Sequence, residues 1–176
     1  MTTAPPPMTP VRTDDIRLAP VTAASCAAVV AVWAGVVGGI VLKAAFGGWM
    51  LLVIMIGSPI LVGIPVLGAA CVTHALVACS STRRRYAVVP RRYVAAAWAI
   101  GAGMFVAGAV LPDGGDDEPA RSAVSAALGL DTASDSWFPV SQVAWLVAAV
   151  AAALAVWWVA ADRRARRRWA VTEPGL

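Results

Sequence analysis

The feature that most constrains this chain is the length of its uncharged apolar segments. No Asp, Glu, Lys or Arg occurs from Ala44 to Thr82, and shorter uncharged runs lie on either side of this one. A charge at mid-membrane costs about 2.5–3.5 kcal/mol or more, so a spanning helix excludes charge over about 20 residues. A water-soluble chain of 176 residues has no core large enough to bury several such segments. The runs therefore predict an integral membrane protein.

The composition agrees with this prediction. Hydrophobic residues make up 60% of the chain and charged residues 14%, against about 45–50% and about 25% in soluble domains. Thirteen of the fourteen basic residues are Arg, a bias typical of GC-rich bacterial genomes, so we expect the bacterial cytoplasmic membrane. A basic chain can bind nucleic acid. Here the arginines flank the apolar runs, so membrane topology explains them better and no nucleic-acid partner is predicted.

Four apolar runs predict an all-α bundle of four transmembrane helices. The expected spans are residues 21–42, 49–79, 93–111 and 138–161. At 1.5 Å per residue the first covers about 33 Å and the third about 28 Å, close to a hydrocarbon core of about 30 Å. Together they form a membrane domain over 21–161. A polar, Pro-rich tail over 1–20, expected to be disordered, precedes it, and a basic tail over 162–176 follows it.

The second run is too long for one straight span and too short for two. Each half of a hairpin would be only about 22 Å long, so one long, tilted or kinked helix is favoured. Pro59 and Pro65 each remove an N–H donor and loosen a turn of this helix. The pair is either a static kink or a hinge or substrate site, as in the broken helices of transporters.

The distribution of arginines fixes the expected orientation. Cytoplasmic segments carry an excess of Arg and Lys, which places both termini in the cytoplasm and the acidic loop 112–137 outside. The same arginines are expected to contact anionic phospholipid headgroups. They are Arg83, Arg84, Arg85, Arg91, Arg92, Arg163, Arg164, Arg166, Arg167 and Arg168.

A short extra helix is expected inside the outer loop. Pro119 suits the first helical position, Asp117 or Glu118 can cap the helix, and Gly129 can end it after Leu128. Val124 and Leu128 would share its apolar side.

Two of the expected spans carry small residues at every fourth position. Gly35 and Gly39 continue such a series in the first span, and Gly103 belongs to a second series in the third span. Small residues at this spacing let two helix backbones approach closely. The contact would lie within the chain, in a homo-oligomer or with another membrane protein. The alternative is that Ala and Gly are simply abundant throughout this chain.

Few residues suggest chemistry. His74 is the only histidine. It is expected near the cytoplasmic headgroups, either as a proton relay or a metal or haem ligand in a symmetric dimer, or as a neutral imidazole bonded to a neighbouring helix. The three cysteines form no CxxC pair, and no carboxylate lies inside a span. Catalytic residues, cofactors and metals are therefore not predicted.

Three functions remain open at this point. The first is a non-enzymatic accessory or scaffold subunit that acts through helix packing. The second is a small transporter or channel component, which predicts a water-accessible cavity beside the Pro59–Pro65 segment or His74. The third is a membrane enzyme that uses His74.

Overall fold

Four long helices and one short helix make up the described part of the protein. The structure is a computed structural model, and it describes residues 23–45, 57, 60–80, 91–112, 121–130 and 137–172. The helices are α1 (Ala23–Ala45), α3 (Gly63–Ser80), α4 (Arg91–Val110), α5 (Ala123–Ala127) and α6 (Trp137–Thr172). Within these ranges there is no β-strand, so the predicted all-α class is confirmed.

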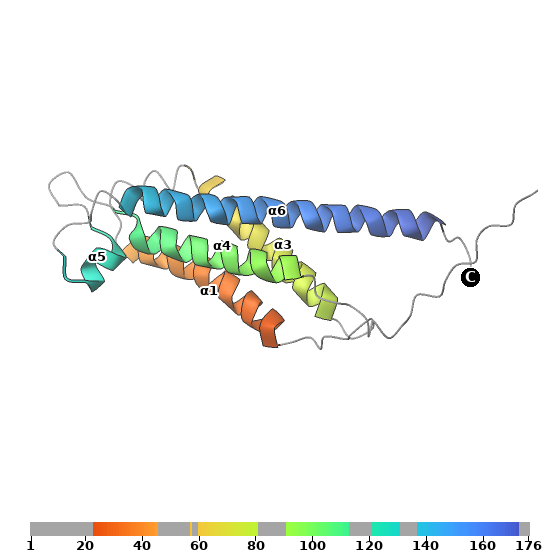
Figure 1. Cartoon of the computed structure of the whole chain (residues 1–176), viewed down its shortest axis with the longest axis horizontal. Coiled ribbons are helices and arrows are strands. Elements are labelled where there is room, and N and C mark those ends of the chain that lie inside the picture. Colours follow the sequence, from red (N-terminus) through yellow and green to blue (C-terminus); the bar gives the residue numbers. More distant parts are fainter. Residues whose placement is uncertain are drawn as a thin grey trace, which may run out of the picture.

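The long helices alternate in direction (Figure 1). α1 and α4 run toward the end of the bundle where α5 lies, and α3 and α6 run back from it. α4 lies in the middle and contacts α1, α3 and α6. The start of α1 and the end of α6 therefore lie toward the same end of the bundle.

Three of the helices are long and apolar enough to cross a membrane. They are α1, α4 and the first 28 residues of α6, Trp137–Arg164. α3 is apolar but shorter, with 18 residues. The expected second span began at residue 49, and its first part, including Pro59, falls outside the described residues. α6 continues without a break through the expected basic tail as far as Thr172.

The outer surface of the bundle is apolar, as expected of a protein whose solvent is lipid. On α6 one continuous stripe of exposed side chains includes Val143, Leu146, Val150, Leu154 and Trp157. Water-soluble monomers rarely expose an apolar patch this long. The stripe therefore supports a membrane environment independently of helix length.

The interior is filled mainly by small side chains. α6 contributes Ala148, Ala152 and Ala155, all fully buried, at the spacing of one narrow helix face. Small side chains gain little from the hydrophobic effect but allow close backbone packing, which drives helix association in lipid.

The glycines named from the sequence lie at helix contacts inside the chain. A Cβ on Gly35 would overlap the backbone of Gly101 in α4, and one on Gly39 would overlap the carbonyl of Met104. Gly103 faces the other way, where a Cβ would lie 2.6 Å from the carbonyl oxygen of Ala144 in α6. These glycines set the spacing of the α1–α4 and α4–α6 pairs.

The short helix of the outer loop differs from its expected form at the start. α5 begins at Ala123, with Ser122 as its cap: the Ser122 hydroxyl accepts from the N–H of Ser125, and the Ser125 hydroxyl accepts from the N–H of Ser122. Pro119 and the acidic caps proposed for it lie outside the described residues. Gly129 follows the helix at φ +67°, a left-handed conformation that favours glycine, as expected of a stop signal. Leu128, on the expected apolar side of this helix, is exposed.

Candidate functional site

His74 does not lie in a polar site. It is exposed on α3, in its second half. Cys26 is exposed and Cys71 half-buried, and both are free thiols. Over the described ranges, no three His, Cys, Asp or Glu side chains lie close enough together to hold a metal ion.

Pro65 breaks the hydrogen-bond ladder at the start of α3, and another helix repairs it. Proline has no N–H, so Pro65 leaves the carbonyl of Leu61, four residues earlier, without its helical donor. The indole Nε1–H of Trp145 in α6 donates to this carbonyl oxygen at 2.9 Å. A freed carbonyl in a membrane protein requires such a partner, because lipid supplies none. Pro65 itself is fully buried.

A cavity of about 500 Å³ lies beside this break. Its walls come from the last turns of α1 and α4, the first turns of α6, and residues 61–62 just before α3. Its volume falls within the range of about 300–1,000 Å³ typical of small-molecule sites. The apolar lining residues include Ile40, Met104, Leu111, Phe138 and Leu146.

Four lining residues carry polar groups. They are Lys43, Ser141, Gln142 and Trp145. Lys43 is only 4% exposed and lies in the last turn of α1, where the helix dipole favours a cation. Ser141 is buried, and its hydroxyl donates to the carbonyl of Phe138 at 2.8 Å. A mostly apolar wall with a few polar groups is typical of small-molecule sites.

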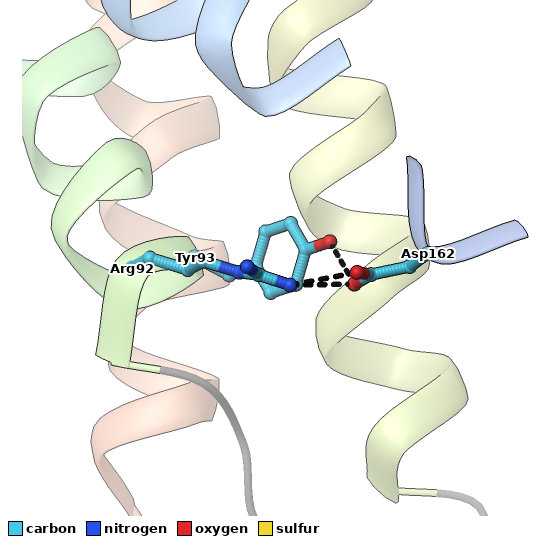
Figure 2. Close-up of polar contacts among 3 residues, drawn as sticks. All are labelled: Arg92, Tyr93 and Asp162. Atoms are coloured by element: carbon cyan, nitrogen blue, oxygen red, sulfur yellow. Dashed lines mark hydrogen bonds and ion pairs between the residues drawn. The ribbon is translucent and has the colours of Figure 1, made fainter. Parts of the chain in front are cut away.

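A second polar cluster joins α4 to α6 at the opposite end of the bundle (Figure 2). The guanidinium Nη2 of Arg92 donates to both carboxylate oxygens of Asp162 at 2.8 Å, and the hydroxyl of Tyr93 donates to Asp162 Oδ2 at 2.7 Å. Two consecutive residues of α4 thus bind one carboxylate of α6.

Aromatic rings support this cluster from one side. The rings of Tyr93 and Trp158 meet edge to face, with centroids 6.2 Å apart and planes at 84°. The Arg92 guanidinium carbon lies 5.2 Å from the Tyr93 centroid and 5.7 Å from that of Trp158, within cation–π range. Tyr93 is buried, whereas Arg92 and Asp162 are partly exposed, so the cluster joins α4 to α6 at the edge of the core.

We expect Asp162→Asn to lower the unfolding temperature in detergent by about 2–4 °C. Arg92 and Asp162 are 41% and 38% exposed, so solvent screening limits their pairing to about 1 kcal/mol. Thermal unfolding at low and high salt measures the effect, which should shrink at high salt. Arg164→Gln, at an exposed position two residues further along α6, is the control and should leave the temperature unchanged. If the unfolding temperature fell equally at low and high salt, ion pairing between Asp162 and Arg92 would not be the cause of the lost stability.

Of the remaining arginines named from the sequence, the structure describes the side chains of three. Arg91, Arg163 and Arg164 are exposed at the same end of the bundle as the Arg92 cluster. Arg166, Arg167 and Arg168 lie on α6, but their side chains are outside the description, as is the whole Arg83–Arg85 segment.

Sequence reasoning missed the two indole donors that join helices. Trp145 donates to Leu61, and Trp33 of α1 donates to the hydroxyl of Thr73 in α3 at 3.0 Å. Tryptophan inside a span, rather than at the membrane interface, is the signal that could have identified them, because a buried indole N–H needs an acceptor.

Comparisons of this chain with protein-family models, with curated proteins and with solved structures give no match.

Proposed function

We propose that this chain is a non-enzymatic accessory protein of the bacterial cytoplasmic membrane that holds a lipid acyl chain at the outer end of a four-helix bundle. The observation that carries this proposal is the cavity beside Leu61 and Trp145. In this proposal α3 crosses the membrane with the three longer helices, both termini are cytoplasmic, and the cavity lies toward the outer leaflet.

The chemistry of the wall favours an acyl chain over an ion or a polar substrate. Apolar side chains from α1, α4 and α6 form most of the lining. A desolvated ion in such a space would lose its hydration without enough replacement ligands. An acyl chain needs only dispersion contacts there, and Ser141, Gln142 and Lys43 supply the few polar groups of the same lining.

The small-residue packing gives this cavity a rigid frame. Gly39 and Gly108 both line it, and a Cβ on either would overlap backbone of the opposite helix. α1 and α4 are therefore held at a fixed spacing along this wall. The close helix packing expected of an accessory protein thus stabilises contacts between helices of this chain.

A small transporter is the second candidate. It is favoured by one observation: residues 61–62, which precede the Pro65 break, form part of the cavity wall. A broken helix that lines a cavity is the usual arrangement in transporters. The apolar wall then points to an amphiphile as cargo rather than to an ion.

Binding of a C16 fatty acid tests the proposal. The full chain, purified in detergent, is incubated with tritiated palmitate, and bound label is measured at equilibrium. We expect saturable binding, and native mass spectrometry should detect a lipid adduct before palmitate is added. Ala107→Phe, at a buried position on the cavity wall, should lower the affinity at least about 10-fold because the added ring occupies the cavity.

A matched variant separates cavity filling from general damage. Ala102→Phe places the same ring at an exposed position of α4 that does not line the cavity, and it should bind palmitate like the wild type. Val62→Trp fills the cavity from the opposite wall and replaces Ala107→Phe where that variant does not fold. Equal binding by the wild type and both filling variants would rule out the cavity as the site.

A further inference from the structure

Lys43 is placed unlike the other basic residues whose side chains the structure describes. It lies in the last turn of α1, at the end of a span, where a long basic side chain usually extends its charge into water. Lys43 is instead only 4% exposed and lines the cavity, whereas Arg91 and Arg164 are exposed. A charge withdrawn from water is costly unless other groups compensate it, and in membrane proteins such residues usually mark function.

We propose that Lys43 makes this cavity selective for amphiphiles with an anionic headgroup, a carboxylate or a phosphate. The inference rests on the proposed function, because it names the ligand class of the same cavity. The ammonium of Lys43 pairs with the headgroup, and the acyl chain lies against apolar lining residues such as Met104 and Leu146. Two sources carry this headgroup chemistry in a membrane: a free fatty acid and an anionic phospholipid.

The net charge of the described lining is positive. Lys43 is the one charged residue among the described residues that line the cavity. The helix ends contribute less: the last turns of α1 and α4 present carbonyl dipoles, and the first turn of α6 presents N–H dipoles, each worth about half an elementary charge. Two carboxyl ends and one amino end amount to about half a negative charge, which the full charge of Lys43 exceeds. An anionic headgroup is therefore favoured over a neutral or cationic one.

The hydrogen-bond donors of the lining favour the same ligand. The hydroxyl of Ser141 and the indole of Trp145 each donate to a backbone carbonyl, so both protons are already used. The other side-chain donors of the described lining are the amide of Gln142, which is exposed, and the ammonium of Lys43. An ammonium has three N–H donors, so an interaction that Lys43 makes within the protein can be shared with a ligand. Carboxylate and phosphate oxygens are strong acceptors for such donors.

The apolar rim of the cavity favours an amphiphile over a free anion. The cavity opens at the surface of the bundle, where the side chains of Ile40, Phe138 and Leu146 line it and are also exposed. An acyl chain can therefore enter from the surrounding lipid without any rearrangement of the helices. A small hydrated anion would lose water at this rim and gain no compensating polar contact there.

Competition among C16 compounds that differ only in their headgroup tests the inference. The full chain in detergent binds tritiated palmitate, which is then displaced by unlabelled palmitate, hexadecanol or hexadecylamine. Hexadecanol should bind at least about 10-fold more weakly than palmitate, the loss expected for one hydrogen bond between charged groups. Hexadecylamine should bind more weakly still, because its charge has the same sign as that of Lys43.

Substitutions of Lys43 test whether this residue causes the preference. Lys43→Met removes the charge but keeps an unbranched side chain, so it should weaken palmitate binding about 10-fold and change hexadecanol binding less than about 2-fold. Lys43→Arg keeps the charge and should keep the preference for palmitate. Arg91→Gln is the matched control, because it removes one positive charge at an exposed position toward the opposite end of the bundle, and it should bind both compounds like the wild type. If Lys43→Met does not fold, the headgroup series and Lys43→Arg still decide the result.

Two phospholipid competitors identify the source of the headgroup. Phosphatidylglycerol and phosphatidylcholine are compared with the same acyl chains, and only the first has a net negative charge. Displacement of palmitate by phosphatidylglycerol at the lower concentration would identify an anionic phospholipid. Displacement by neither lipid, with palmitate still preferred to hexadecanol, would identify a free fatty acid. Equal displacement by both lipids would contradict selection by charge.

The failure of this inference is distinguishable from the failure of the proposed function. If the wild-type chain binds palmitate and hexadecanol equally well, selection by headgroup charge is wrong and the acyl-chain site stands. If the wild type prefers palmitate but Lys43→Met keeps the same preference, the role given to Lys43 is wrong. If the wild-type chain binds neither compound, the site and its selectivity both fail.

Discussion

Gly35→Ala is expected to lower the unfolding temperature of the detergent-purified protein by about 5–10 °C. The added Cβ would lie 2.5 Å from Gly101 Cα and would overlap the Gly101 carbonyl. Both are backbone atoms, so neither can rotate away, and α1 must shift relative to α4. Overpacking of this kind costs about 1–3 kcal/mol or more. A chain of this size changes by about 2–4 °C per kcal/mol.

Gly38→Ala is the control on the same helix. A Cβ there would meet only the ring of Phe105, at 3.3 Å, and that side chain can adjust. Alanine is also a better helix former than glycine by about 0.5–1 kcal/mol. Gly38→Ala should therefore unfold at the wild-type temperature or up to about 3 °C above it. Thermal unfolding followed by circular dichroism measures both variants, and equal losses in the two would refute backbone contact as the cause.

This contrast marks how far the sequence predicts the packing. The four-residue spacing of Gly35 and Gly39 predicted a close helix contact on α1. It did not identify the partner residues, because abundant Ala and Gly give α4 several small faces. Gly101 and Gly108 face α1, whereas Gly103 faces α6. Two residues along a helix differ by about 200° in direction, so only the tertiary structure distinguishes these faces.

The positions of the helices were easier to predict than the contacts between them. α1, α4 and the apolar part of α6 begin and end within a few residues of the expected spans. The bilayer excludes charge from each spanning segment independently, so each span can be predicted from the sequence of that segment alone. The bonds of Trp145 with Leu61 and of Arg92 with Asp162 join residues 84 and 70 positions apart, and no local pattern encodes such pairs.

The start of α5 could not be decided from the sequence, because two different helix-start signals lie close together there. Pro119 with an acidic cap and Ser122 with Ser125 are both acceptable helix starts. The structure uses the serine pair, whose reciprocal side-chain bonds satisfy two N–H groups at once. Ser122 and Ser125 are both fully buried, which makes satisfying those donors more important than it would be in water.

Cysteine labelling is expected to give an all-or-none result for the topology. In a chain whose Cys26, Cys71 and Cys79 are replaced by Ala, the Ala126→Cys variant should react with an impermeant maleimide on intact cells. Arg164→Cys should react only after the membrane is permeabilised. Ala126 lies on α5 and Arg164 toward the far end of α6, and both positions are exposed.

The physical reason is the agreement of charge with the alternating direction of the helices. α6 is about 54 Å long at 1.5 Å per residue, so it extends well past a core of about 30 Å and carries its arginines out of the lipid. α3, at about 27 Å, is slightly shorter than this core, so its crossing is the part of the expected topology that most needs a test. Arginine-rich ends are expected to stay cytoplasmic, which would put α5 outside.

A third labelled position tests whether α3 crosses. With four crossings, Thr3→Cys near the N-terminus shares the protected side with Arg164→Cys. With three, because α3 does not cross, the chain changes sides once less and these two positions lie on opposite sides of the membrane. Labelling of Thr3→Cys and Arg164→Cys on opposite sides would therefore exclude α3 as a span. Protection of Ala126→Cys together with labelling of the other two would keep four spans but reverse the orientation, and the arginine excess would then not decide how this chain inserts.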